Sequence, residues 1–231
     1  LVAAAMIGPR LGKYAGKHVN VIPGHTIPLG ALGVFILWLG WFGFNGASTL
    51  AADPALVPTV IANTFLSASA GIISTAFYTK FRYGHIDGSL TLNGALAGLV
   101  GITAGAANLS LVGSIIAGFV AGIILVEGVR FIEWKLKVDD PVGAVAVHGL
   151  CGVWGTLAVG LFDVAGGGGL FYGGGATLLG VQAIGILAVV AWTGITVALS
   201  LSLIKVFVPL RVSREEEIEG LDISEHGSHA Y

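Results

Sequence analysis

The sequence predicts an all-α protein that crosses a membrane several times. Apolar residues make up 55% of its 231 residues and charged residues only 10%, and the mean hydropathy is +0.90. A soluble domain carries about 25% charged residues, so the charges here are too few to cover a water-exposed surface. The 37 glycines follow no Gly-X-Y period, and the long aliphatic runs exclude both collagen and disorder.

A helix that crosses a bilayer needs about 20 apolar residues. Six stretches meet this requirement: Ile27–Asn45, Ala55–Tyr78, Ser89–Ala107, Leu111–Gly128, Pro141–Phe162 and Gly174–Leu210. The last is too long for one bilayer and must tilt, kink or extend beyond it. The segment Leu1–Gly8 is apolar but short, and no initiator Met or basic region makes it a signal peptide. We interpret it as the end of a span, and we expect the chain to be a fragment.

The basic residues predict how the spans are oriented. All 11 Lys and Arg residues fall in or beside alternate connections, which are Pro9–Thr26, Thr79–Gly88, Arg130–Asp140 and the tail. The intervening connections carry only Asp53 and Asp163. Because an excess of Lys and Arg marks cytoplasmic loops, we expect the basic connections and the C-terminus to be cytoplasmic in a multi-pass cell-membrane protein.

Small residues recur at helical spacing within the spans. The sets are Gly94/Gly98, Gly118/Gly122 and Gly149/Gly152/Gly155. In a lipid environment such faces let helix backbones approach closely. They predict close packing rather than any particular function.

Polar residues within spans are costly, so they are the first candidates for function. His148 follows Asp140 by eight residues, about 12 Å along a helix, which places it near the bilayer centre. There the imidazole should be neutral and able to exchange a proton with a small base. The alternative is a buried histidine that is bonded to a neighbouring helix. Cys151 follows three residues later, but two ligands are too few for a metal site, and we expect no metal or cofactor.

Other polar residues favour structural roles. Asp139-Asp140-Pro141 reads as an Asp N-cap with proline at the first helical position. Glu127 is expected to pair with Arg130 at i+3. The amides of Asn93 and Gln182 are expected to form interhelical hydrogen bonds.

The first complete span carries a polar and aromatic face at its outer end. Its residues, at i, i+3, i+4 and i+7, are Trp41, Phe44, Asn45 and Ser48. An aromatic face with a hydroxyl acceptor suits a small cation that is losing water. An ordinary belt of aromatic residues at the membrane interface is equally consistent with this spacing.

Two classes of function are disfavoured. The net charge of −2 supplies no general basic surface for nucleic acid. No nucleophile, base and orienting carboxylate share a span, so a hydrolytic enzyme is not expected.

Three motifs resemble the ammonium transporter (Amt/MEP) family. They are the run GWFGFNGAS at 40–48, the DDP…VHGLCG pattern at 139–152, and the tail from RVS at 211–213 through GLD at 220–222 to EHG at 225–227. The resemblance implies a homotrimer of eleven-helix protomers whose first ten helices form two inverted five-helix repeats. This chain would hold the end of helix five, helices six to eleven, and the tail.

The resemblance also implies site residues. Phe44 corresponds to a phenylalanine gate, and Trp41 and Ser48 to the outer recognition region. His148 corresponds to the second of two pore histidines that relay a proton, and Asp140 to a structural aspartate that caps its helix. The first histidine and the remaining site residues belong to helices before Leu1. We therefore expect the 231 residues alone to be inactive.

The implied function is the transport of ammonium or ammonia, and of methylammonium as an alternative substrate, through a pore in the membrane lipid. Residues 1–210 would form the transmembrane domain and residues 211–231 a cytoplasmic regulatory tail. By itself the acidic tail, which ends in Ala230-Tyr231, is typical of a solvated end. The resemblance implies an ordered element that docks a PII signalling protein. An ammonium sensor and a Rhesus-like gas channel remain as alternatives.

Overall fold

The computed structural model describes residues 1–229, and Ala230 and Tyr231 at the end of the tail lie outside the described residues. The helical elements and the two strands are, in order, α1 Val2–Ile7, β1 Tyr14–Ala15, β2 His18–Val19, α2 Ile27–Ala47, α3 Leu56–Tyr83, α4 Gly88–Thr103, α5 Leu111–Arg130, η1 Phe131–Leu136, η2 Val145–Leu150, α6 Cys151–Phe162, η3 Leu170–Tyr172, α7 Thr177–Phe207, α8 Arg214–Glu219 and α9 Leu221–His226. The antiparallel pair β1–β2 is the one sheet in the described part of the chain, which also holds an isolated antiparallel bridge between Leu109 and Asp163.

Five stretches are long and apolar enough to cross a membrane: α2, α3, α5 with η1, η2 with α6, and α7. The sixth predicted span is shorter than expected, because α4 has only 16 residues. It packs against α2, α3, α5 and α6, and residues such as Leu99 and Ile102 are completely buried. Protein rather than lipid therefore surrounds α4, and the bilayer thickness sets its length less strictly.

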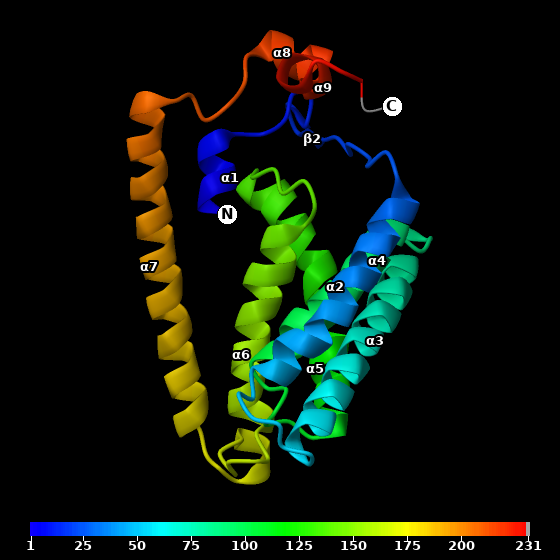
Figure 1. Cartoon of the computed structure of the whole chain (residues 1–231), viewed down its shortest axis with the longest axis vertical. Coiled ribbons are helices and arrows are strands. Elements are labelled where there is room, and N and C mark those ends of the chain that lie inside the picture. The colour runs from blue at the N-terminus through cyan, green and yellow to red at the C-terminus, as the bar shows by residue number, and fades with distance from the viewer. Residues whose placement is uncertain (230–231) are drawn as a thin grey trace.

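The helices run alternately up and down, as the charge pattern predicts. In Figure 1 the strand pair, the α3–α4 turn, η1 and the tail lie at one end of the molecule, and the other connections lie at the opposite end. The connections that carry Lys and Arg are all at the first end, which we call the basic end. The prediction that basic residues mark alternate connections is consistent with this arrangement.

Close backbone contacts hold α3, α4 and α5 together. A Cβ atom at either Gly98 or Gly118 would overlap the carbonyl oxygen of Ser67, and one at Gly122 would overlap the Ser74 hydroxyl. The prediction that both GxxxG pairs are packing faces is thus confirmed. Such contacts let dispersion act between backbones where lipid supplies no hydrophobic drive.

The third glycine set behaves differently. A Cβ at Gly155 would overlap the Gly101 backbone, but those at Gly149 and Gly152 would meet single side-chain atoms at 3.8 and 3.7 Å. The prediction of close packing is therefore wrong for Gly149 and Gly152, which line a cavity instead. Spacing of three residues turns successive positions by about 300°, so the three glycines do not share one narrow face.

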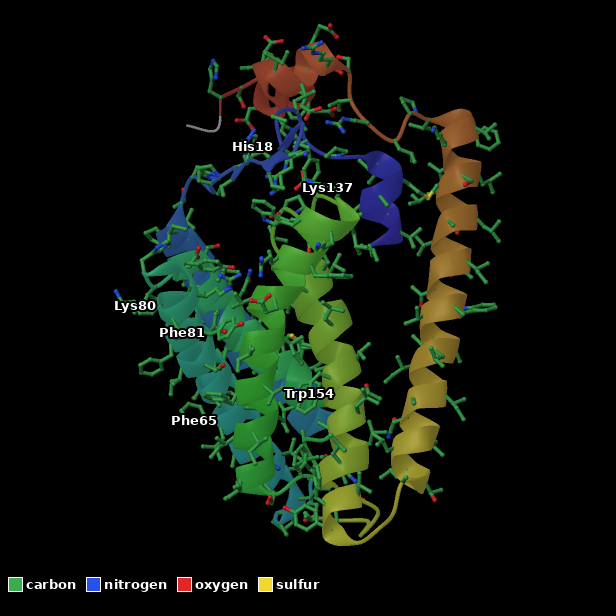
Figure 2. The ribbon with its side chains drawn as sticks, turned by 180° about the vertical axis from the view of Figure 1, so that it is seen from behind. His18, Phe65, Lys80, Phe81, Lys137 and Trp154 are labelled. Carbon is green, nitrogen blue, oxygen red and sulfur yellow. The ribbon has the colours of Figure 1, made fainter. Side chains whose placement is uncertain are left out.

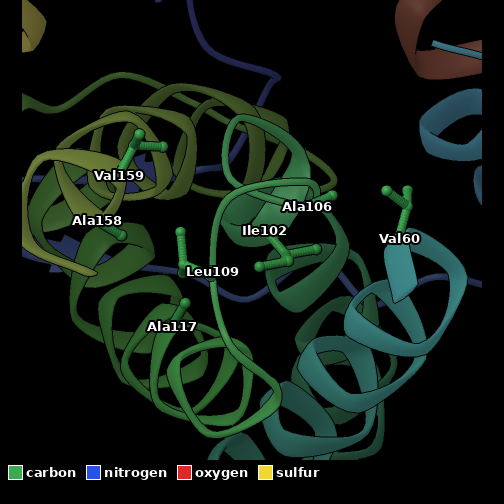
Figure 3. Packing of buried hydrophobic residues seen from close by; sticks show 7 residues of the cluster. All are labelled: Val60, Ile102, Ala106, Leu109, Ala117, Ala158 and Val159. Carbon is green, nitrogen blue, oxygen red and sulfur yellow. The ribbon is translucent and has the colours of Figure 1, made fainter. Parts of the chain in front are cut away.

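An apolar cluster packs the ends of α3 to α6 opposite the basic end. Figure 3 shows its buried members: Val60, Ile102, Ala106, Leu109, Ala117, Ala158 and Val159. Beside it the buried amide of Asn63 donates to the carbonyl oxygens of Ala106 and Leu109, at 2.9 and 2.8 Å. This amide ties α3 to the turn between α4 and α5.

Helix α7 stands apart from this bundle. It is one continuous helix of 31 residues with no buried residue, about 46 Å long at 1.5 Å per residue, against a bilayer core of about 30 Å. Its contacts are with α6 and α1, and Figure 1 shows it flanking the bundle with α1 beside it. Because α7 is longer than the bilayer core, the expectation that this span tilts, kinks or extends beyond the bilayer stays a prediction.

Candidate functional site

A cavity of about 720 Å³ lies between α6 with η2, α7 and α1. Its walls are apolar except for four polar side chains: His148, Thr156, Gln182 and Thr193. The Thr156 hydroxyl donates to the Gly152 carbonyl of its own helix at 2.9 Å. The imidazole, the Gln182 amide and the Thr193 hydroxyl are therefore the polar groups that remain for a small molecule in a mostly apolar space.

His148 lies in a π-helical segment, η2, that leads directly into α6. A π-helical turn shifts the direction of the side chains that follow it, and such turns are frequent at functional sites. The Asp140 carboxylate accepts hydrogen bonds from the backbone N–H groups of Val145 at 2.9 Å and Ala146 at 3.4 Å. Asp140 thus holds the start of the helical segment that carries His148.

The predicted start of this helix at Pro141 is wrong. Helical structure begins at Val145, because a turn intervenes and Gly143 adopts a positive φ of 70°, a conformation that favours glycine. The Asp140 carboxylate bridges this turn instead of capping a helix that begins at the next residue.

The His148 ring is exposed to the cavity. The part of the chain that the structure describes gives it no hydrogen bond and no ion pair. The alternative of a buried histidine that is bonded to a neighbouring helix is therefore not observed among residues 1–229.

The two intramembrane amides have different surroundings. The Asn93 amide of α4 donates to the Val142 carbonyl at 3.0 Å, and Val142 lies in the turn before η2, so the bond joins a helix to a turn and not, as predicted, two helices. The predicted bond of Gln182 is wrong for the described residues. Gln182 is half-buried on the cavity wall, because the α7 face that carries it has no partner helix within reach.

At the end of α2 opposite the basic end, two of the predicted residues contact neighbouring helices and one remains exposed. The Trp41 indole N–H donates to the Thr103 hydroxyl at 2.9 Å, and the Asn45 amide donates to the Thr64 hydroxyl at 3.0 Å. Phe44 remains 58% exposed, and its ring meets the Trp41 ring edge-on with a centroid distance of 5.4 Å.

Ser48 follows the last residue of α2, and its hydroxyl donates to the Phe44 carbonyl. The structure therefore brings Trp41, Phe44 and Ser48 together at the end of the molecule opposite the basic end. None of the three lines the His148 cavity. Trp41, Phe44 and Ser48 therefore form one candidate site and His148 a second, separate one.

A buried ionic cluster at the basic end was missed in the sequence. Asp139 accepts from the Arg10 guanidinium at 2.8 and 2.9 Å and from the Arg10 backbone N–H at 3.0 Å. The ammonium of Lys13, whose side chain is 4% exposed, lies 2.6 Å from Glu133 and 3.9 Å from Asp139. The sequence signal for this cluster was the pair Asp139-Asp140. A helix cap needs only one carboxylate, so the second aspartate required another partner.

The charges in this cluster stabilise one another. Burial raises the pKa of Asp139, but the hydrogen bonds from Arg10 outweigh burial, so this pKa lies below its usual value. The hydrogen bond to Asp139 likewise raises the pKa of Arg10. Both groups are therefore charged at neutral pH.

The tail contacts the same segment. Arg211 pairs with Glu217 at 2.6 Å and donates to the Pro9 carbonyl at 2.6 Å. Glu217 also accepts from the Leu11 backbone N–H at 2.7 Å. Residues 9–13 thus connect the tail to Asp139, one residue before the carboxylate that holds the segment of His148.

Two further observations concern charged residues. Glu127 lies 3.3 Å from Arg130, which confirms the predicted pair, and it also contacts Arg82 and Tyr78. Across residues 1–229, no group of three or more His, Cys, Asp or Glu side chains could hold a metal ion.

The model of the ammonium transporter family matches residues 1–231. The ammonium transporter Amt2 of Archaeoglobus fulgidus is 41% identical over all of this chain and 51% of its own length. A putative ammonium transporter of Synechocystis is 40% identical over 98% of this chain and 50% of its own length. The chain spans about half the length of the curated relatives it matches.

Solved structures show the same relationship. A protein described as a sensor Amt protein superposes with a TM-score of 0.89 at 37% identity, over 97% of this chain and 56% of that one. Mep2 of Candida albicans gives 0.82 at 29% identity, over 93% and 50%. The five helices that could cross a membrane and these similarities agree: the chain belongs to the ammonium transporter family.

Proposed function

We propose that the protein containing this chain carries ammonium across a membrane along a path that passes the His148 cavity. The observation that carries this proposal is an imidazole that has no partner among residues 1–229 and lies on a mostly apolar cavity wall. An apolar path disfavours a bare cation, because a charge at the bilayer centre costs several kcal/mol. A neutral base such as ammonia passes more easily, and an imidazole can take up or return its proton.

At the opposite end from the basic loops, Trp41 and Ser48 would recruit the ammonium ion. The exposed Phe44 ring and the adjacent Trp41 ring offer aromatic faces, and cation–π attraction strengthens as a cation loses water. Phe44 would act as the gate. Beyond it the substrate would separate into ammonia and a proton, with His148 as the proton relay and Asp140 as a positioning residue.

Residues 1–210 would form the transport domain, and residues 211–229 of the tail would have a regulatory role. Glu217 and Arg211 attach α8 to residues 9–11, so the acidic tail is held against the transport domain. We assign it to the cytoplasmic side, where it would contact a neighbouring protomer of a homotrimer and a PII protein. Charge alternation supports this orientation.

A second function is an ammonium sensor. Its support is the similarity to a protein described as a sensor Amt protein, together with the contacts that connect the tail to Asp139. A Rhesus-like gas channel would use the same cavity without net charge movement.

The test uses a chimera in which residues 1–231 replace the matching half of the Archaeoglobus relative. We expect yeast cells that lack their own ammonium transporters to grow on low ammonium with the chimera, but not with residues 1–231 alone. Equal protein levels are verified by blotting. Absence of uptake by a folded chimera would refute the transport proposal, and uptake by the 231 residues alone would refute the need for a second half.

A further inference from the structure

We propose that two threonines, Thr64 and Thr103, position the end of α2 opposite the basic end for recognition of the ammonium ion. Each threonine accepts a hydrogen bond from α2, and together they fix the rotation of this helix about its own axis. The inference rests on the proposed function, in which the Trp41 and Phe44 rings meet the ion. Both threonines act through the side chains that they hold.

Thr103, the last residue of α4, is held in one hydrogen-bonding role. Its hydroxyl donates to the Leu99 carbonyl of its own helix at 2.7 Å and accepts from the Trp41 indole N–H at 2.9 Å. Because a hydroxyl has one hydrogen and an indole nitrogen can only donate, this arrangement cannot be reversed. The Thr103 oxygen therefore fixes the orientation of the Trp41 ring.

Thr64 on α3 makes the same arrangement one turn further along α2. Its hydroxyl donates to the Val60 carbonyl at 2.7 Å and accepts from the Asn45 amide at 3.0 Å. Thr64 is completely buried and Asn45 is 5% exposed, whereas Figure 2 shows the adjacent Phe65 on the outer side of α3. A buried amide without an acceptor costs free energy, so this bond favours one rotation of α2 against α3.

The two bonds together set the direction of the Phe44 ring. Successive residues of an α-helix turn by about 100°, so Trp41 and Asn45 point within about 40° of each other, and Phe44 lies about 60° from Trp41 on the other side. The Phe44 and Trp41 ring planes are inclined by 62°. A rotation of α2 by about 20° would move a ring about 6 Å from the helix axis by about 2 Å. Because cation–π attraction acts within about 6 Å of the ring centroid, such a shift alters the affinity for a cation.

The uptake test places Thr103→Val or Thr64→Val in the chimera of residues 1–231 with the Archaeoglobus relative. Valine keeps the shape of threonine but has no acceptor. We expect each variant to raise the KM for methylammonium about threefold, the equivalent of the ~0.6 kcal/mol that an interhelical hydrogen bond contributes on average in a membrane. The maximal rate should not change, because His148 lies in a separate site. A loss of folded protein would instead lower the maximal rate and leave the KM unchanged.

Rescue and control variants separate positioning from general stability. Thr103→Ser and Thr64→Ser keep the acceptor oxygen and should keep the wild-type KM. Thr59→Val is the matched control on α3, since the Thr59 hydroxyl donates to the Ala55 carbonyl of its own helix at 3.0 Å and accepts from no side chain among residues 1–229. This control should change neither the KM nor the maximal rate.

The hydrogen bond to Trp41 is tested without transport. The purified 231-residue chain, with nitrogen-15 in its five tryptophans, gives indole N–H resonances in micelles, and Trp41→Phe identifies the resonance of Trp41. Thr103→Val should shift this resonance upfield, because the indole loses its acceptor. The resonance of Trp154 should not move, since its indole N–H donates to the Ala117 carbonyl at 2.9 Å.

An unchanged KM in either valine variant would overturn the role of that threonine, and so would an equal rise of the KM in Thr59→Val. A Trp41 resonance that stays in place in Thr103→Val would overturn the role of Thr103 whatever the uptake result. Absence of uptake by the wild-type chimera refutes the transport proposal instead, so the two failures are distinguishable.

Discussion

The contact between Arg10 and Asp139 provides the most quantitative prediction. It joins the segment before α2 to the loop before η2 through three hydrogen bonds of 2.8 to 3.0 Å. The Asp139 side chain is 2% exposed and that of Arg10 is 35% exposed. Removing one partner of a fully buried pair costs about 3–5 kcal/mol, whereas exposed pairs contribute about 0.2–1 kcal/mol. Because one side chain of this pair is buried and the other is partly exposed, we expect an intermediate coupling energy of about 2 kcal/mol.

The assay is a double-mutant cycle with Arg10→Gln, Asp139→Asn and the double variant. The free energy of unfolding is measured in micelles by denaturant titration, with the fluorescence of the five tryptophans as the signal. The control cycle uses Arg82→Gln and Glu127→Gln. That pair is 3.6 Å apart with side chains 38% and 40% exposed, so its coupling should stay below about 1 kcal/mol.

Comparing the two cycles tests whether the Arg10–Asp139 contact couples the two loops and whether burial sets the strength of the coupling. A coupling below about 0.5 kcal/mol for Arg10 and Asp139 would show that this contact does not hold the two loops together. Equal coupling in the two pairs would show that burial does not decide the strength of these contacts.

Three further predictions follow from particular contacts. Gly118→Val should unfold the α3–α5 packing, because a Cβ there overlaps the Ser67 carbonyl, while Gly180→Ala, with open space around it, should be neutral or stabilising; equal melting temperatures would contradict this. Because the pKa of Asp139 is lowered in the folded state, its contribution is present above the unfolded value of about 3.9 and is lost as the pH falls through the folded value. Wild-type protein should therefore lose more stability than Asp139→Asn on acidification, and parallel losses would contradict the shift. Ser213→Ala removes the N-cap of α8, whose capping box is complete, and should cost about 1 kcal/mol and speed amide hydrogen exchange in 214–219; unchanged exchange would show that the cap does not order the tail.

Much of the fold could be predicted from the sequence, because bilayer thickness and charge placement leave a strong signal. The start of α5 at Leu111 and the close approach at Gly98 and Gly118 follow from local sequence alone. The short α4 could not be predicted, since its length depends on neighbours that replace lipid. The π-helical start of the His148 segment depends on the turn at Gly143. The proline at position 141 predicted an earlier helix start, so this turn was not expected.

The candidate site was less predictable. Spacing placed Trp41 and Phe44 on one helical face, but it could not show that Trp41 turns inward to Thr103 while Phe44 remains exposed. His148 could be selected because a polar residue in a span is costly. Its relation to the cavity depends on α7, which is distant in the sequence. The Arg10–Asp139 pair spans 129 positions, and no local pattern predicts such a contact.

We propose above that His148 relays a proton while ammonia passes. The most direct test records ammonium-induced current from proteoliposomes that contain the chimera with the Archaeoglobus relative, or its His148→Ala variant. We predict that the His148→Ala variant loses the proton-coupled current or admits K⁺ as well as ammonium. A variant with unchanged current and unchanged selectivity against K⁺ would contradict it.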